Sequence, residues 1–396
     1  MFGLHWQDKE DRVTKLTKIY MIVMAILIAL TLVTAVWHSQ VVSNAQVAVT
    51  QAGHATKNNG GVAANYANAT ATEANNLRFF LVLSGSLLAA AGIWGLVEYV
   101  FLPLINLSRI GAITQVTYHE ALYQPFTLIV FVMCIAAIVI TAFVPFNTFG
   151  EDTKMYRDVA MSFILMFILV IMVFATAKVI DEEIENRTML TLMSKPVARW
   201  QVIIGKYLGI ACLIFVTMAI CTIVAAACAW LRYFSDQRID LSVASYAGQQ
   251  ALFWANDMAI IALIPAFVLQ FTELATLAAI STAIATRYSL ALNMTVIVVL
   301  YIGANLTRFV PLLHLGAPWQ TMVDGGSYFL PYLTNFDINQ ALIYRSISMP
   351  GHYQGPDAPT LSEIVSYVSL ATVYGLMYIG AALSVAVALF RNRELT

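Results

Sequence analysis

The chain has 396 residues, of which 60% are hydrophobic and only 11% are charged, with a formal net charge of −1. This apolar excess, with a mean hydropathy of +0.76, is larger than one soluble core could bury, which excludes a water-soluble globular protein and indicates an integral membrane protein. The sequence shows no basic patch with interleaved aromatic residues, so nucleic acid is not an expected partner, whereas the lipid bilayer is.

Apolar runs long enough to cross a bilayer recur along the chain. Roughly 20 helical residues cross the hydrocarbon layer of about 30 Å. The runs lack the period-two alternation of barrel strands, so they predict an all-α fold, a polytopic helical membrane protein. The eight predicted spans cover residues 19–37, 79–105, 126–146, 159–179, 207–230, 258–284, 290–310 and 364–390.

The first two spans predict an N-terminal hairpin at residues 1–107. The charged stretch before residue 19 is typical of a signal peptide, but the apolar run that follows is too long for one, so we interpret the first span as a retained anchor. Residues 38–76 are rich in Asn, Ala, Thr and Gly, which predicts an exposed extracytoplasmic linker of about 40 residues. We expect the hairpin to be an appendage to a six-span core at residues 125–396.

Residues 108–124 predict a helix that lies on the inner membrane surface. The segment is polar enough to leave the bilayer, yet Ile110, Ile113 and Val116 recur at helical spacing before Pro125. An ordinary connecting loop is the alternative interpretation.

The cysteines and histidines predict neither a disulfide framework nor a metal site. All four cysteines fall inside predicted spans, where they behave as small apolar residues. The six histidines show no metal-ligand spacing. We therefore expect no cofactor and no metal in this chain.

Residues 181–206, "DEEIENRTMLTLMSKPVARWQVIIGK", carry four acids followed by four bases. The fourth span is predicted to continue as a helix into the acids and to break at "SKP". A new helix then has Ser194 as its cap and Pro196 in its first turn. This predicts a helix–break–helix projection on the cytoplasmic face, a shape suited to docking a partner. In the alternative interpretation, the bases only fix the topology and the acids keep the loop soluble.

At these residues the chain resembles the permease subunits of type-2 ATP-binding-cassette transporters. The family pattern has spaced glutamates, a Thr, a short apolar run, a Pro followed by an Arg, and a Gly-Lys before the next span. The matching residues are Glu183, Glu185, Thr188, Leu190, Leu192, Pro196, Arg199, Gly205 and Lys206. Where many members have Gly before the Thr, this chain has Arg187.

Several segments look like one subgroup of that family, the permeases of nitrous-oxide-reductase and multicopper-enzyme maturation. These segments are "EIENRT", "SKPVARW", "YFLPYLTNFDI" at 328–338 and "LFRNREL" at 389–395. The resemblance covers roughly residues 105–396 and leaves the hairpin outside the six-span core.

The resemblance implies that residues 181–206 sit in a cleft of a separate ATPase subunit and couple nucleotide hydrolysis to the spans. It also implies a second permease copy, identical or not, and export through a bacterial-type inner membrane. The chain itself is expected to be no enzyme, because Gly205-Lys206 is followed by Tyr207 and no phosphate-binding loop occurs, so ATP and Mg²⁺ belong to the partner. The coupling residues carried over are Glu183, Glu185, Arg187, Thr188, Lys195, Pro196 and Arg199.

The distribution of Lys and Arg predicts that both termini are cytoplasmic. With that orientation, thirteen of the 21 lie in the shorter cytoplasmic segments. The loop 311–363 is then extracytoplasmic. Within it, Phe336 and Ile338 begin a short amphipathic face after Asn335, a good helix cap, which predicts a structured external cap or a partly re-entrant element.

Glu273 and Gln270 lie near the middle of the sixth predicted span. A carboxylate at this depth is costly, so it should face a helix interface or a wet cavity, or be protonated. It either lines the translocation path or accepts a hydrogen bond from Thr or Asn, for instance from Asn293 or Asn305. Glu98, near the inner end of the second span, is expected to be interfacial.

Two other functions fit the sequence. The chain could be an ion-coupled secondary transporter that uses Glu273, or a membrane scaffold or assembly factor whose charged segment recruits another cytoplasmic protein.

Overall fold

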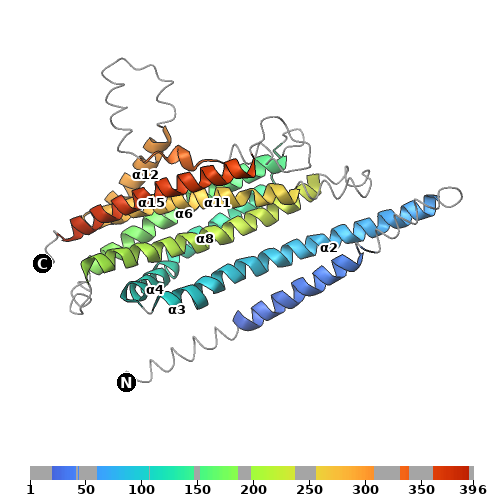
Figure 1. Ribbon diagram of the computed structural model, residues 1–396, viewed down its shortest axis with the longest axis horizontal. Helices are drawn as coiled ribbons and strands as arrows, with labels where there is room; N and C mark the ends of the chain where they lie inside the picture. The colour runs from blue at the N-terminus through green and yellow to red at the C-terminus, as the bar shows by residue number, and fades with distance from the viewer. Residues whose placement is uncertain are drawn as a thin grey trace, which may run out of the picture. The chain divides into compact units, whose positions relative to one another are not determined.

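The computed structural model describes residues 20–41, 43, 60–106, 108–146, 152–185, 198–236, 256–306, 331–338 and 360–391. The elements in these ranges are helices (Figure 1). Seven are long and apolar enough to cross a membrane, and an eighth, shorter apolar helix is Leu290–Leu306. The predicted fold class, a polytopic all-α membrane protein, is confirmed.

The helices follow the predicted spans closely. The candidate spans are Tyr20–Val41, Leu77–Ile105, Pro125–Ala142, Asp152–Val179, Arg199–Tyr233, Asn256–Ala285 and Leu361–Phe390. The secondary-structure elements are α2 (Gly60–Gly95), η1 (Leu96–Phe101), α3 (Leu102–Ile105), α4 (Arg109–Leu122), α5 (Pro125–Ala142), α6 (Asp152–Glu185), α8 (Arg199–Asp236), α11 (Leu263–Ala285), α12 (Leu290–Leu306), η3 (Leu333–Phe336) and α15 (Leu361–Arg391).

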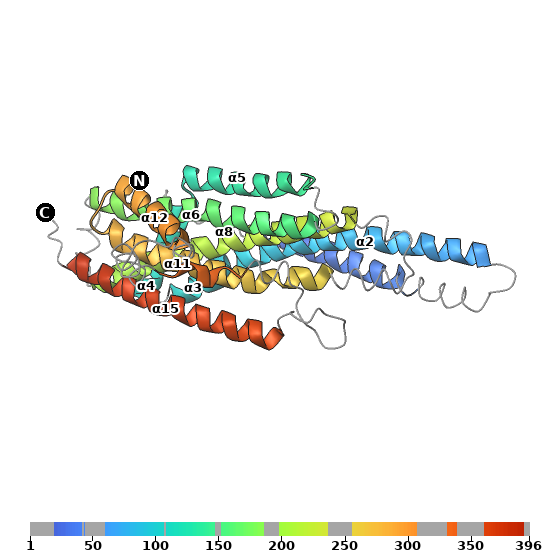
Figure 2. The ribbon, with the colours of Figure 1, turned by 90° about the horizontal axis from the view of Figure 1, so that it is seen from above.

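The chain divides into two compact units. The hairpin unit comprises residues 1–95 and 230–255, and the core unit comprises residues 96–229 and 256–396. In the hairpin unit, the helix Tyr20–Val41 runs alongside α2 (Figures 1 and 2). The Tyr20 ring packs edge-on against Trp94 at 5.6 Å and lies where a side chain on Gly95 would be. At the opposite end of the hairpin, Val41 packs on Leu77.

Helix α2 corrects the prediction of a linker at residues 38–76. It begins at Gly60, so residues 60–76 continue the second span as a helix. At about 1.5 Å per residue this adds about 25 Å to the span. Six of these residues are alanines, and alanine is the strongest helix former, a local preference that the Asn-rich composition concealed.

The core unit is built around α6, α8 and α11. Helix α5 packs on α6, α6 packs on α11 and α12, and α11 packs along α15 (Figures 1 and 2). The buried positions recur every four residues on α6 and α8, which places them on one helix face. They include Ile164, Ile168, Met172, Ile210, Ile214 and Met218.

The segment 108–124 is helical, as predicted, and forms α4, whereas its place on the membrane surface stays a prediction. Ser108 caps it by accepting a hydrogen bond from the Gly111 amide at 3.0 Å. The side that packs on the protein carries small residues, including Gly111 and Thr114, whereas Val116 is 65% exposed. Of the apolar positions noted in the sequence, Ile110 and Ile113 are half-buried and Ile113 packs on the protein, whereas Val116 points away from it.

Candidate functional site

The predicted coupling segment is described only at its two ends. Glu183 and Glu185 lie in the last turn of α6, and Arg199 is the first residue of α8. Arg187, Thr188, Lys195 and Pro196 lie outside the described residues. The continuation of the fourth span as a helix through the acids is confirmed, because α6 runs unbroken to Glu185.

The start of α8 differs from the predicted one. Ala198 is not helical, and its amide donates to Oε1 of Gln201 at 3.1 Å. This is half of a capping box, in which a side chain three residues into a helix satisfies an amide at its start. The predicted cap Ser194 and the predicted first-turn residue Pro196 lie outside the described residues, and within them α8 begins at Arg199, where Gln201 bonds the Ala198 amide. Helix α8 then continues to Asp236 without a separate surface helix.

A buried lysine ties the two limbs of the segment together. Lys206 of α8 is 1% exposed and donates from Nζ to the carbonyl oxygen of Val179 in α6 at 2.9 Å. Lys206 comes seven residues after Arg199, the first residue of α8, and Val179 comes six residues before Glu185, the last residue of α6. Each separation is about 10 Å along the helix. A hydrogen bond from a charged donor is stronger than a neutral one. The bond therefore joins the first turns of α8 to the last part of α6.

Two glycines let α4 approach the first turns of α8. A side chain at Gly205 would lie 2.9 Å from Ile113, and one at Gly209 would lie 2.7 Å from Thr117. Thr114 Oγ1 also donates to the Gly205 carbonyl oxygen at 3.2 Å. The glycines are four residues apart and share one helix face, as in other close-packed membrane helices. Helix α4 and the start of α8 therefore form one packed body.

The same turns of α8 contact the ends of two other helices. Val202 and Ile203 pack against Ala283 of α11 and against Ala386 and Phe390 of α15. We call these five residues the basal cluster. The first turns of α8 are therefore in direct contact with α11 and α15.

Glu273 and Gln270 are both buried in α11, with 4% and 3% of their surfaces exposed. Gln270 Nε2 donates to the carbonyl oxygen of Met161 at 3.4 Å, and Gln270 Oε1 has no hydrogen-bond partner. No described residue donates a hydrogen bond to the carboxylate of Glu273. The structure thus brings the two predicted residues together on one face but leaves oxygen acceptors unsatisfied.

The predicted asparagine partners of Glu273 bond elsewhere. Asn293 Nδ2 donates to Oγ of Ser281 at 2.9 Å, and Asn305 Nδ2 donates to the carbonyl oxygen of Tyr301 at 3.0 Å. Ser281 comes two turns after Glu273 on α11, about 12 Å further along the helix. The prediction of an Asn–Glu273 hydrogen bond is therefore wrong for both asparagines.

The loop predicted to be extracytoplasmic packs into the helical core at η3. Leu333 and Phe336 are each 1% exposed and belong to the main core cluster. The Phe336 ring lies 3.3 Å from the place of a side chain on Gly375, and the Thr272 methyl group also meets that place. Gly375 comes fourteen residues after Leu361, the first residue of α15, or about 21 Å along the helix. This contact lies within the candidate span Leu361–Phe390, and the partly re-entrant form of the loop stays a prediction.

Tyrosines of α15 hold this re-entrant element. The hydroxyl of Tyr374 accepts a hydrogen bond from the Tyr332 amide at 3.0 Å, and Tyr367 donates to the carbonyl oxygen of Asn335 at 2.8 Å. The helical turn is a 3₁₀ helix, Leu333–Phe336, so Asn335 lies inside it and does not cap a following helix as predicted.

Sequence reasoning missed Asp337. This residue follows Phe336, is exposed, and its charge acts on the carboxyl group of Glu273. It is the only acid between Asp324 and Asp357. A single acid in a long stretch without other acids could have drawn attention to Asp337 in the sequence. The sequence could not show that it lies near Glu273 of the sixth span.

Glu98 and the four cysteines make structural contacts and form no catalytic or metal-binding group among the described residues. Glu98 lies in η1, with Oε1 3.4 Å from Nε2 of His119 on α4, so it ties this turn to α4. All four cysteines are free, and Cys221 donates to Cys134 at 3.6 Å in the apolar core. In the described part of the chain, no three His, Cys, Asp or Glu side chains gather as metal ligands.

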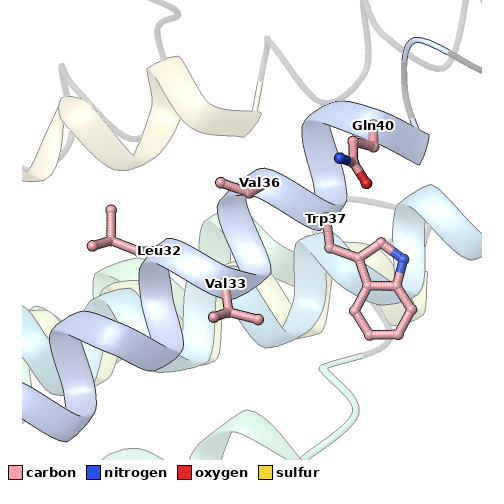
Figure 3. Close-up of a pocket in the computed structure, with 5 residues that line it drawn as sticks. All are labelled: Leu32, Val33, Val36, Trp37 and Gln40. Atoms are coloured by element: carbon pink, nitrogen blue, oxygen red, sulfur yellow. The ribbon is translucent and has the colours of Figure 1, made fainter.

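The first span carries an open apolar groove. Figure 3 shows its lining on the helix Tyr20–Val41, with side chains spaced about one turn apart. None of the lining residues titrates, so the groove offers hydrocarbon contact and no chemistry. The lining residues are Leu32, Val33, Val36, Trp37 and Gln40.

Comparison with known proteins gives one family match. The profile described as "ABC-2 family transporter protein" matches residues 4–395. The match includes the N-terminal hairpin, so the extent of roughly 105–396 that we assigned from the motifs was too short. A search of curated proteins finds no match.

Proposed function

Because the chain belongs to the ABC-2 family of transporter proteins, we propose that it is the permease subunit of an ATP-driven exporter in a bacterial-type inner membrane, with both termini cytoplasmic. Permeases of this family are membrane subunits without a catalytic domain that work with ATP-binding-cassette ATPase subunits. ATP and Mg²⁺ bind to the ATPase subunits, and this chain carries no cofactor. Two permease copies, identical or not, form the transmembrane part.

The basal cluster is the observation that carries this proposal. The ATPase holds the acids and bases of residues 181–206, and closure of the nucleotide-binding subunits moves both limbs. Lys206 holds the two limbs together, and the contacts of Val202 and Ile203 transmit the movement to α11 and α15. Since these two helices pack along their lengths, a push at their cytoplasmic ends moves them as a pair.

Helices α11 and α15 together form the surface on which the re-entrant element packs. Glu273 comes ten residues before Ala283 of the basal cluster, so about 15 Å of helix separates the driven end from the Phe336 seat. Movement of α11 against α15 changes the space around Gly375 in which Phe336 sits. Glu273 and Gln270 lie at this level and line the path, and the re-entrant element closes it on the extracytoplasmic side.

The test is co-purification of the chain with its ATP-binding-cassette ATPase subunit. Reversing two charges with Glu183→Lys and Glu185→Lys should weaken binding at least tenfold, because rim charges on a docking element then repel the partner site that they fit. Glu363→Lys, at the far end of α15, is the matched control and should leave binding unchanged.

Two results would contradict the proposal at different points. Full ATPase binding by the double variant would reject the residue assignment but leave the permease function standing. Flux driven by an ion gradient without any ATPase, and abolished by Glu273→Gln, would replace the proposal with the secondary transporter. Recruitment of a cytoplasmic protein without any flux would favour the scaffold.

A further inference from the structure

Arg157 of α6 is a buried cation without an acidic partner. Only 6% of its surface is exposed, and Nη1 donates a hydrogen bond to the carbonyl oxygen of Ala259 at 2.8 Å. No carboxylate among the described residues pairs with its guanidinium group. A neutral carbonyl oxygen offsets only part of the cost of burying a full charge. The buried guanidinium therefore lacks a counter-charge in the described part of the fold.

The unused edge of this guanidinium group is the one that fits an oxyanion. The bond to Ala259 occupies Nη1, which leaves Nε and Nη2 on the other edge. Nε is buried and has no hydrogen-bond partner. Two parallel N–H groups on one edge match two oxygens of a phosphate or carboxylate group, and lysine cannot reproduce this arrangement.

Asn256 supplies a second unsatisfied donor on the helix that Arg157 contacts. It is 4% exposed, and its Nδ2 is buried without a hydrogen-bond partner. Asn256 comes three residues before Ala259 in the helical span Asn256–Ala285, so the two are neighbours on one helix face, about 4.5 Å apart along the axis. The bond to Ala259 therefore brings the guanidinium group to the face that carries Asn256. Both donors belong to the core unit.

The acids nearest in sequence do not satisfy these donors. Asp158 follows Arg157, and Asp257 follows Asn256. Successive residues on a helix do not face each other. Both acids are half-buried and have interactions of their own. The two donors on the shared face thus remain without an acceptor.

We propose that Arg157 and Asn256 form a binding site for a phosphate group, carried by a lipid headgroup or present as free phosphate. The unsatisfied atoms are hydrogen-bond donors, and the guanidinium group adds one positive charge. Donors and positive charge together favour an oxyanion, because charge-assisted hydrogen bonds from arginine to phosphate are strong and bidentate. A bound phosphate satisfies Nε of Arg157 and Nδ2 of Asn256 and supplies the missing counter-charge.

The site lies where two spans begin. Arg157 comes five residues after Asp152, the first residue of a 28-residue span, and Asn256 is the first residue of a 30-residue span. Helices of this length measure about 42–45 Å, whereas the hydrocarbon layer is about 30 Å thick, so their first turns reach the headgroup layer. A phospholipid can present its phosphate there without leaving the bilayer. By the predicted topology, this is the extracytoplasmic side.

The test measures thermal unfolding of the purified full chain in phosphate-free detergent after its lipids have been exchanged away. Sodium phosphate and dihexanoylphosphatidylglycerol are titrated separately, with NaCl and dihexanoylglycerol as the controls without phosphate. We expect a phosphate compound to raise the unfolding midpoint by about 3 °C at a hundredfold excess over Kd. A shift with both compounds identifies a site for free phosphate, and a shift with the phospholipid alone identifies a headgroup site.

Variants of the two donors locate the binding. Arg157→Lys keeps the charge but loses the bidentate edge, and Asn256→Asp replaces a donor with a negatively charged acceptor. Each should weaken phosphate binding by about tenfold. Arg109→Gln, at an exposed position of α4, and Asn305→Asp, whose native amide bonds within its own helix, are the matched controls and should keep the shift.

Isothermal titration calorimetry on Asn256→Asp measures the affinity without unfolding, so it decides the question even where the Arg157 variant is too unstable to purify. The proposal is overturned if neither phosphate compound binds, if NaCl gives the same shift, or if Asn256→Asp binds phosphate as tightly as the unchanged chain. The inference does not rest on the proposed function, since binding is measured on the chain without its ATPase.

Discussion

Lys206 places a primary amine in the apolar core at the base of the coupling segment, where only 1% of its surface is exposed. Burial of an ammonium group is unfavourable, and a hydrogen bond to the Val179 carbonyl oxygen offsets part of that cost. In the sequence this residue reads as a charge flanking the fifth span. Its actual position could not be predicted, because the partner lies on another helix.

Lys206→Met keeps the length of the side chain and removes the donor. We expect this substitution to lower the free energy of unfolding by about 1.5–3 kcal/mol, since hydrogen bonds to charged groups contribute in this range. Lys178→Met is the matched control, because Lys178 is only half-buried in α6 and lies over the Phe174 ring at 5.9 Å. Thermal unfolding in the same detergent compares the two. Equal or higher stability of Lys206→Met would show that its desolvation outweighs its hydrogen bond.

At the scale of elements, the close contact of α4 with α8 depends on the absence of side chains. Gly205 and Gly209 remove the bulk that would hold the helices apart, and Thr114 bonds across the gap. The sequence predicted α4 as an element. It did not indicate which face packs, because the glycines belong to a segment that reads as the end of a coupling loop.

Gly209→Ala tests this contact. Its methyl group would lie 2.7 Å from Thr117 and 2.8 Å from the Thr114 carbonyl oxygen, so α4 must shift. We expect destabilisation by about 1–3 kcal/mol, the range for overpacking. Gly380→Ala on α15 has no neighbour within 4 Å of the new methyl group and should be neutral or slightly stabilising. If both variants unfold at the same temperature, α4 does not pack here.

At the scale of the whole molecule, the orientation of the termini depends on α12. This helix has 17 residues and is about 25 Å long, short of the hydrocarbon thickness of about 30 Å. It is held to α11 by the Asn293–Ser281 hydrogen bond, and a short span is accommodated by local thinning of the bilayer. If α12 crosses, eight spans put both termini on one side.

Labelling with a membrane-impermeant maleimide checks the topology. Gly3→Cys and Thr396→Cys should both stay unlabelled in intact cells and react after permeabilisation. Asn59→Cys, in the predicted extracytoplasmic part of the hairpin, should react in intact cells. The natural cysteines give little background because all four lie inside spanning helices. Labelling of only one terminus in intact cells would mean that α12 does not cross.

The span positions and the fold class follow from local hydropathy, because bilayer thickness sets the length of each apolar run whatever its neighbours are. Local hydropathy also identifies Glu273 as a costly acid in the sixth span. Other features depend on which helices touch. The Lys206–Val179 bond, the depth of Phe336 and the approach of Asp337 to Glu273 join residues distant in sequence. Side-chain volume and helix packing set these contacts, and no local pattern encodes them.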